Sequence, residues 1–323
     1  MSELLTKKWL AIINPASGGG KVKKKWNKII KNELDNIGLQ YTEYFTTGPE
    51  DAINKVESSI NEYDGFIAIG GDGTCNEVLN GILYGTIEKN KPNNKILAMI
   101  PAGTGNDLCH AAGIPHKNIK EACRLFITGQ IKSIDTGKAS GKNFDDESVN
   151  RYFNGVLSTG MDAEVAYRTN TSSKWLPGTL NYVKSLLITL IGLKTRGYEV
   201  KLNGTEISEN GIFLAVGLGP YYGGGMMICP NAKVDDGMFD IIFLRKVPRR
   251  TILRVFPKVY DGKHITHPKV IEYEAPSIEI NNSIPTYYQT DGETIGYTPV
   301  KITTVKAGLN VLVSKEEKEE DQN

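Results

Sequence analysis

The sequence is poor in cysteine, and its few cysteines are not arranged for metal or disulfide chemistry. There are four cysteines among 323 residues, and no two of them form a C-x-x-C pair. Zinc knuckles and disulfide frameworks depend on regularly spaced cysteines, so we expect neither. No signal peptide precedes the first strand-like run, which begins at Trp9. These absences predict a protein of a reducing compartment, the cytoplasm.

The chain also lacks a dominant charge and a long hydrophobic run. It carries 38 Lys and Arg residues against 37 Asp and Glu residues, a net charge of +1. Proteins that bind nucleic acid by bulk charge need a strongly basic face, so we expect no nucleic-acid partner. The longest apolar run, Leu186–Leu193, is much shorter than the ~20 apolar residues of a membrane-spanning helix. We therefore expect no transmembrane segment.

The length predicts two domains, because domains usually contain roughly 100–200 residues. In the first, residues 1–134, short apolar runs alternate with segments of helical spacing such as the one from Val22 to Ile37. The strand-like runs are Trp9–Ile13, Leu39–Phe45, Phe66–Ile69 and Ile96–Ile100. This alternation is typical of a parallel sheet with crossover helices. It predicts an α/β domain of Rossmann-like type.

From about residue 135 the pattern changes to short β-branched and aromatic runs separated by turn signals such as Asn203-Gly204. Residues 135–299 therefore predict a β-rich second domain, an antiparallel sandwich or barrel. Two helices are expected to interrupt it, at Gly178–Leu193 and Arg249–Tyr260. Two further strands, Val300–Val305 and Leu309–Val313, are expected to return to the first domain, so that residues 300–314 complete it. Residues 315–323 form a charged tail.

Glycine is concentrated in three clusters, each directly after a predicted strand: Asn14–Gly20, Gly70–Asn76 and Pro101–Asp107. The loops after the carboxyl ends of parallel strands lie along one edge of the sheet, where ligands bind. Glycine lets backbone N–H groups approach an anion, and helix N-termini add a favourable dipole. Any one cluster could be an ordinary strand-to-helix turn, but three together favour phosphate binding. The chain contains no G-x-x-x-x-G-K-[ST], so it is not a P-loop protein.

The three clusters resemble the catalytic-domain motifs of the diacylglycerol kinase and lipid kinase family. NAD kinases are distant relatives that share the Gly-Gly-Asp-Gly-Thr core. Pro230–Asp240, Gln289–Glu293 and Thr266–Ile271 are similar to second-domain motifs of the soluble bacterial diacylglycerol kinases. The resemblance covers residues 8–313 and implies a kinase that uses ATP and Mg²⁺.

The resemblance also implies roles for individual residues. Glu293 matches the general base, Asp72 the residue associated with the catalytic magnesium, and Asp107 a supporting acidic residue. The positions that match the family's nucleotide-holding residues are Asn14, Pro15, Ala16, Ser17, Gly18, Thr46, Gly70, Gly71, Asp72, Gly73, Thr74, Cys75, Asn76 and Thr104. Carboxylates supply the hard oxygen ligands that Mg²⁺ prefers. For Asp72 the alternative is a turn-capping Asp. For Glu293, which follows the Asp291-Gly292 turn signal, the alternative is a plain exposed Glu.

A second, structural magnesium site is implied by the backbone carbonyls of Lys233 and Met238 and the carboxylate of Asp236. The alternative is a hairpin turn without metal, since Asp-Gly is a common turn sequence. One position departs from the family pattern, which usually places Arg three residues after the Asn-Asp pair. This sequence has His110 there, which could contact an anionic group only in its protonated form.

The motifs together predict transfer of the γ-phosphate of ATP to the hydroxyl of diacylglycerol, which gives phosphatidic acid. The alternatives are a kinase of another lipid, such as phosphatidylglycerol or a sphingoid base, and a nucleotide-binding regulator without catalysis. The expected partner is a membrane lipid, met transiently at the inner membrane face. The sequence leaves the oligomeric state open, a homodimer included. The basic face expected to contact anionic lipid consists of Lys21, Lys23, Lys24, Lys25, Lys28 and Lys31.

Overall fold

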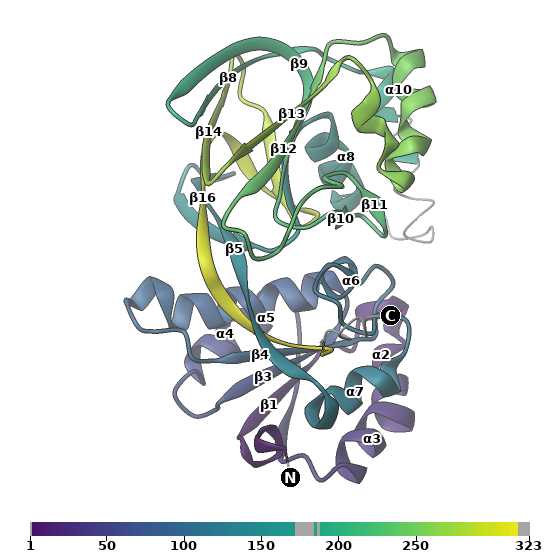
Figure 1. Ribbon diagram of the computed structural model, residues 1–323, viewed down its shortest axis with the longest axis vertical. Helices are drawn as coiled ribbons and strands as arrows, with labels where there is room; N and C mark the ends of the chain where they lie inside the picture. The colour runs from purple at the N-terminus through teal and green to yellow at the C-terminus, as the bar shows by residue number, and fades with distance from the viewer. Residues whose placement is uncertain (1, 172–183, 186–187, 316–323) are drawn as a thin grey trace, which may run out of the picture. The chain divides into compact units, whose positions relative to one another are not determined.

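The chain folds into two compact units, which are drawn in the ribbon diagram of a computed structural model (Figure 1). The structure describes residues 2–171, 184–185 and 188–315. The first unit comprises the residues up to Ile134 together with those from Gly308 on, and the second unit is Asp135–Ala307. The first is α/β and the second is β-rich, so the predicted fold class is confirmed.

The chain crosses between the units within two strands. These are β5 (Gln130–Asn143) and β16 (Glu293–Val313). The carboxylate of Asp135, the first residue of the second unit, accepts the backbone N–H of its last residue, Ala307, at 2.7 Å. In the first unit, the hydroxyl of Ser133 donates to the side-chain oxygen of Asn310 at 2.8 Å. Each unit therefore has its two chain ends hydrogen-bonded to one another.

The end of the chain differs from the prediction. Residues 300–313 were expected to form two strands, but they lie within the single strand β16. Ala307 adopts a positive φ of 49°, and its N–H bonds to Asp135. The sequence Lys306-Ala307-Gly308 resembles a turn, and the backbone is irregular at Ala307, but the strand continues through it to Val313. Only the residues from Gly308 on belong to the first unit.

The first unit is built on a parallel sheet in the order β2, β1, β3, β4 and the end of β16. The strands not yet defined are β1 (Trp9–Ile13), β2 (Tyr41–Phe45), β3 (Gly65–Gly70) and β4 (Ile96–Pro101). Every residue of β1, β3 and β4 is buried, as expected for parallel strands covered on both faces. The ring of Trp9 fills the space over Gly65, where a Cβ would lie 2.3 Å from it.

The helices of the first unit follow the predicted alternation. They are η1 (Glu3–Thr6), α1 (Ser17–Gly20), α2 (Val22–Lys25), the π-helical η2 (Trp26–Ile30), α3 (Lys31–Asn36), α4 (Asp51–Ser58), α5 (Asp72–Gly85), η3 (Ile87–Lys89), α6 (Asp107–Ala111) and α7 (Ile119–Thr128). Gly81 of α5 lets α4 approach closely, because a Cβ there would lie 2.6 Å from the Cβ of Val56. This packing fixes the position of α5, whose first residue is Asp72.

The second unit is an antiparallel sheet that closes on itself. The closed ring runs β9–β8–β14–β16–β15–β7 and returns to β9, so the barrel-like alternative holds. Its interior packs buried side chains such as Phe153, Tyr198 and Val216. The strands are β6 (Ser148–Phe153), β7 (Val156–Gly160), β8 (Arg196–Leu202), β9 (Thr205–Gly217), β10 (Tyr221–Tyr222), β11 (Met226–Met227), β12 (Phe239–Arg245), β13 (Val270–Ala275), β14 (Ser277–Asn282) and β15 (Tyr287–Thr290).

Helices of the second unit pack against the outside of this sheet. They include α8 (Met161–Thr171), α10 (Arg249–Val255), η4 (Phe256–Asp261) and η5 (Lys263–Thr266). The helix predicted from Arg249 is confirmed, but it changes to 3₁₀ geometry at Phe256, directly before Pro257. No local sequence pattern indicated α8. Half of the helix predicted at Gly178–Leu193, residues 178–183 and 186–187, lies outside the described residues. Within the described part of the chain, no helix is both long and apolar enough to cross a membrane.

Candidate active site

The three glycine loops of the first unit meet at the carboxyl ends of β1, β3 and β4. The backbone N–H of Asn14 donates to the carbonyl of Ile69 at 3.1 Å. The N–H groups of Ala102 and Gly103 both donate to the carbonyl of Gly70, at 2.8 and 2.7 Å. Hydrogen bonds therefore join the first loop to the end of β3, and the start of the second loop to the third loop. This is the edge at which ligands bind in parallel α/β sheets.

Hydroxyl and amide groups of the first two loops form one polar cluster. The Asn14 side-chain N–H donates to the Thr74 hydroxyl at 3.1 Å, and the Ser17 hydroxyl lies 3.2 Å from the same oxygen. The Asn14 side-chain oxygen also accepts the N–H of Ala16 at 3.0 Å. The predicted residues Asn14, Ser17 and Thr74 are thus in contact, although about sixty positions separate the first two from the third.

Two of the glycines are required by close backbone approach. A Cβ on Gly103 would lie 2.4 Å from the Cα of Gly71, so the third loop cannot carry a side chain at this contact. Gly18 has a positive φ of 60°, and a Cβ there would lie 3.0 Å from the carbonyl oxygen of Ala102. The result is a surface of bare backbone, which suits a polyphosphate.

Asp72 joins the second loop to the third. Its two carboxylate oxygens accept the backbone N–H groups of Asn106 and Asp107, at 2.8 and 2.7 Å. Burial and the neighbouring carboxylate of Asp107 raise the pKa of Asp72 above its usual value, despite these hydrogen bonds. The negative charges of the two carboxylates repel one another. A divalent cation bound between their oxygens would relieve this repulsion. Asp72 and Asp107 therefore fit a magnesium site.

Of four other residues predicted to hold the nucleotide, one is exposed on a loop and three are buried. Thr104 is exposed on the third loop, whereas Thr46 is buried and its N–H donates to the carbonyl of Ile13 at 2.9 Å. Cys75 and Asn76 are buried inside α5, and the Asn76 side-chain oxygen accepts a hydrogen bond from Asn80. The side chains of Cys75 and Asn76 hold the loop in place from behind.

Lys25 contributes to the same region, a role that the sequence did not indicate. Its ammonium group donates to the carbonyl of Ala102 at 2.7 Å, so it lies beside the third loop. Lys31, also expected on the free basic face, pairs with Glu43. Both lysines were predicted only from the charge of the helix, which does not tell which cations have internal partners. The exposed part of the predicted basic face consists of Lys21, Lys23, Lys24 and Lys28.

In the second unit, Glu293 follows the Asp291-Gly292 turn and begins β16. Its carboxylate pairs with the guanidinium of Arg151 at 2.6 Å. The Arg151 side chain is 8% exposed and that of Glu293 is 42% exposed, so the cation is fixed and the carboxylate faces solvent. Asp291 accepts the N–H groups of Asn154, Gly155 and Val156 at 2.9–3.2 Å, which makes the turn rigid. The sequence did not identify Arg151, because 142 positions separate it from Glu293.

The loop predicted to hold the structural magnesium is anchored to Asp135. The Asp135 carboxylate accepts the N–H of Gly237 at 2.6 Å, and the Asp135 N–H donates to Val234 at 2.7 Å. Asp236 is exposed, and one of its oxygens accepts the N–H of Met238 at 3.0 Å, a turn-forming hydrogen bond.

The surroundings of this loop are acidic. Burial raises the pKa of Asp240 to about 6, with contributions from Glu274, Asp236 and Glu272. Asp240 lies directly opposite Glu274 in the β12–β13 pair. Among the described residues, no three His, Cys, Asp or Glu side chains lie close enough together to hold a metal ion, so a cation at Asp236 would depend on backbone carbonyls as well. The turn geometry is present with or without a cation.

His110 lies in α6, next to the third loop. Its ring packs against that of His116, with centroids 4.3 Å apart. Burial, His116 and Lys117 all lower the pKa of His110. The lowered pKa disfavours the protonated form of His110, and with it the positive charge that the family pattern places there.

Comparison with known proteins covers both units. Residues 8–139 match the family model described as the diacylglycerol kinase catalytic domain. Residues 155–313 match the YegS C-terminal NAD kinase beta sandwich-like domain. The chain is 32% identical over 311 residues to a diacylglycerol kinase of Mycobacterium tuberculosis, with 94% of each chain covered. It is 29% identical over 310 residues to a diacylglycerol kinase of Bacillus subtilis, covering 96% of this chain and 97% of the relative.

A solved structure shows the same fold. The crystal structure of a diacylglycerol kinase from Bacillus anthracis superimposes with a TM-score of 0.71 at 23% identity, over 96% of this chain and 98% of that one. The three glycine loops, with Asp72 and Asp107, lie within the residues that match the diacylglycerol kinase catalytic domain. This chain belongs to the diacylglycerol kinase family.

Proposed function

We propose that this lipid kinase transfers the γ-phosphate of ATP to the hydroxyl of diacylglycerol and so produces phosphatidic acid. The observation that carries the proposal is the meeting of three glycine loops, the first bonded to Thr74 and the third to Asp72 of the second, combined with a rigidly held Glu293 in the other unit. The similarity to proteins named diacylglycerol kinase along 94% of the chain supports this choice of acceptor.

In this proposal the first unit binds the nucleotide. The bare backbone around Gly71 and Gly103 and the hydroxyls of Ser17 and Thr74 receive the phosphates. Asp72 and Asp107 would hold Mg²⁺, which when bound neutralises charge on the transferring phosphoryl group. By bonding to the backbone of Asn106 and Asp107, Asp72 also keeps the third loop in position before the nucleotide arrives.

The second unit supplies the base. The carboxylate of Glu293 accepts the proton of the lipid hydroxyl while the new O–P bond forms, which helps a poor nucleophile at neutral pH. The buried guanidinium of Arg151 restricts where this carboxylate can point. In this proposal Glu293 acts on the lipid hydroxyl, and ATP binding does not require it.

The experiment that tests the proposal is a phosphorylation assay with radiolabelled ATP and a panel of micellar lipids. The panel contains diacylglycerol, phosphatidylglycerol, sphingosine and a lipid without a free hydroxyl. We expect label in phosphatidic acid, and none in the last lipid. Labelling of another lipid with none on diacylglycerol would overturn the choice of acceptor. Tight ATP binding without turnover on any hydroxyl lipid would indicate a regulator without catalysis.

We also propose that the enzyme meets its substrate at a membrane surface through electrostatic attraction. Lys21, Lys23, Lys24 and Lys28 are exposed on one helical stretch of the first unit. Anionic lipid should therefore raise activity, and salt should reduce the gain. Liposome sedimentation that is independent of phosphatidylserine content and of ionic strength would rule out this attraction.

A further inference from the structure

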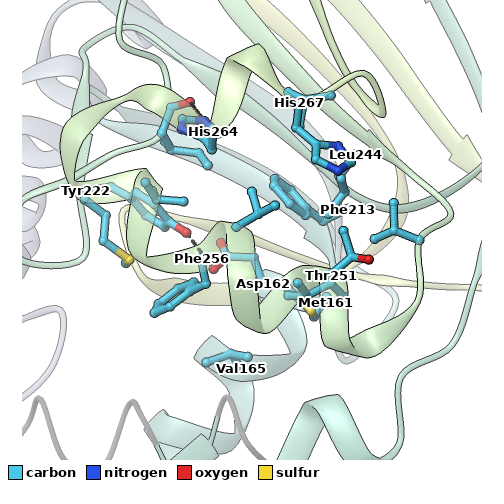
Figure 2. A pocket seen from close by; sticks show the side chains of 17 residues that line it. Met161, Asp162, Val165, Phe213, Tyr222, Leu244, Thr251, Phe256, His264 and His267 are labelled. Carbon is cyan, nitrogen blue, oxygen red and sulfur yellow. Dashed lines mark hydrogen bonds between the residues drawn. The ribbon is translucent and has the colours of Figure 1, made fainter.

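The second unit contains an apolar cavity that lies apart from the candidate catalytic residues. Its volume is about 60 Å³. One wall is helix α8, a second is formed by strands β9 and β12, and a third by residues 249–267, which include α10, η4 and η5 (Figure 2). We call residues 249–267 the cap. Most of the cap side chains that line the cavity are apolar, including Ile252, Phe256 and Val259, and so are Val165 and Phe213 from the other walls. The polar lining residues of the cap are Thr251, His264 and His267.

The cavity has a polar edge that connects it to the Gln289–Glu293 motif. Asp162 of α8 lines the cavity and accepts the Tyr222 hydroxyl at 2.8 Å, as Figure 2 shows. The other Asp162 oxygen accepts the Ser158 hydroxyl at 2.6 Å and a Gln289 amide N–H at 3.4 Å.

The same Gln289 continues the connection to the base. Its side-chain oxygen accepts the backbone N–H of Gly292 at 2.6 Å, and Gly292 is the residue before Glu293. An unbroken series of hydrogen bonds therefore leads from the cavity edge to the turn that carries the proposed base. This places the cavity on the acceptor side of the chemistry.

The outer face of the cap has the composition of a lipid-contacting surface. It contains five basic residues and one acidic residue, Asp261. The basic residues are all exposed: Arg249, Arg250, Arg254, Lys258 and Lys263. Between them, Leu253 and Tyr260 are 52% and 47% exposed. Exposed apolar side chains among cations are typical of segments that lie in the interface of an anionic bilayer.

From these observations we propose that the cavity holds the end of one acyl chain of the lipid substrate, beneath a cap that lies against the membrane. This inference rests on the proposed function, because it names where part of the acceptor binds. At about 60 Å³ the cavity accommodates the end of one chain and not a whole lipid, since an apolar cavity of ~150 Å³ holds benzene. The alternative is a simple packing void, and acyl-chain selectivity distinguishes the two.

The test compares two substitutions of the same chemical kind. Ile252→Phe adds bulk to the cavity wall, where Ile252 is 5% exposed. Ile284→Phe adds the same bulk in the loop between β14 and β15, where Ile284 is 50% exposed. Each variant is assayed with dibutyryl, dioctanoyl and dipalmitoyl glycerol, and its unfolding is followed by circular dichroism. In Ile252→Phe we expect kcat/KM for the dipalmitoyl lipid to fall at least about tenfold relative to the dibutyryl lipid. In Ile284→Phe this ratio should stay at the wild-type value.

A second measurement does not depend on the variant's folding or on turnover. Wild-type protein is irradiated with a diacylglycerol that carries a diazirine at the end of one acyl chain, and the labelled peptides are mapped by mass spectrometry. We expect label on α8 or on the cap.

The outcomes separate this inference from the proposed function. Equal losses for all three chain lengths in Ile252→Phe, or label only outside α8 and the cap, would overturn the inference while diacylglycerol remains the substrate. Phosphorylation of a different lipid would overturn the proposed function. The diazirine chain carried on that lipid would then decide the role of the cavity.

Discussion

Replacing Glu293 by Gln tests the proposed base because it removes the ability to take up a proton and leaves the other properties of the side chain nearly unchanged. Gln keeps the size of the side chain and an oxygen that can accept the Arg151 guanidinium, but it cannot take up a proton. A positioned general base is typically worth about 10²–10⁴-fold in rate, so we expect kcat to fall by that factor. ATP affinity should stay close to wild type, because the nucleotide loops belong to the other unit.

The cost to folding follows from the Arg151–Glu293 pair. The substitution changes an ion pair into a hydrogen bond between a cation and a neutral amide. Because Glu293 is 42% exposed, solvent already weakens the ion pair. We therefore expect a loss of about 1 kcal/mol in the free energy of unfolding, which leaves the protein folded under assay conditions.

The assay is single-turnover phosphoryl transfer with diacylglycerol micelles, alongside ATP binding and chemical denaturation. Glu209→Gln is the matched control, since Glu209 pairs with Arg245 in the same unit and has no proposed role in catalysis. The control should lose similar stability and keep its rate. A Glu293→Gln variant with near-wild-type turnover would refute the assignment, and Asp72 would become the better candidate for the base.

Three further predictions concern the other carboxylates. Asp72→Asn keeps only one of the two oxygens that accept the backbone N–H groups of Asn106 and Asp107, so it should lower the free energy of unfolding by about 1–3 kcal/mol. It should also lower turnover and raise the Mg²⁺ concentration needed for half-maximal rate. An unchanged Mg²⁺ titration would contradict this. Asp236→Asn keeps the oxygen that bonds to Met238, so it should abolish any rise of Tm with Mg²⁺ without loosening the turn in EDTA; an equal Mg²⁺ effect in the wild type and the variant would favour a turn without metal. The pKa of Asp240 is raised to about 6, so ionisation in the folded state costs stability as pH rises from about 4 to about 6. In EDTA, Asp240→Asn should therefore gain about 1 kcal/mol over wild type at pH 8, a value reduced for solvent screening, and nothing below pH 4; a pH-independent difference on denaturation would disprove the electrostatic cause.

The sequence predicted the parts of this structure that depend on local pattern. Continuous apolar runs identified the buried parallel strands, and glycine clusters after them identified the edge at which the loops meet. The first unit could be predicted well because strand periodicity, helix spacing and turn chemistry agree there.

Contacts between distant positions could not be predicted in this way. Arg151 carries no local sign of its pairing with Glu293, and the Asp72 carboxylate reaches a loop 34 positions away. Helix α8 was missed because it mixes polar and apolar residues without a clear stripe and is held by packing on the sheet. The closure of the second sheet depends on the pairing of β8 with β14, which lies outside any local pattern.

The hydrogen bonds at Asp135 and Ser133 make the second unit an inserted module. Asp135 is bonded to Ala307, so residues 135–307 begin and end at the same place. Ser133 is bonded to Asn310, so removing the insert leaves a gap in the first unit that a short peptide can bridge. Insertions are best tolerated where chain ends lie close together. In a chain of this design the second unit can be altered or replaced while the first unit keeps its own core.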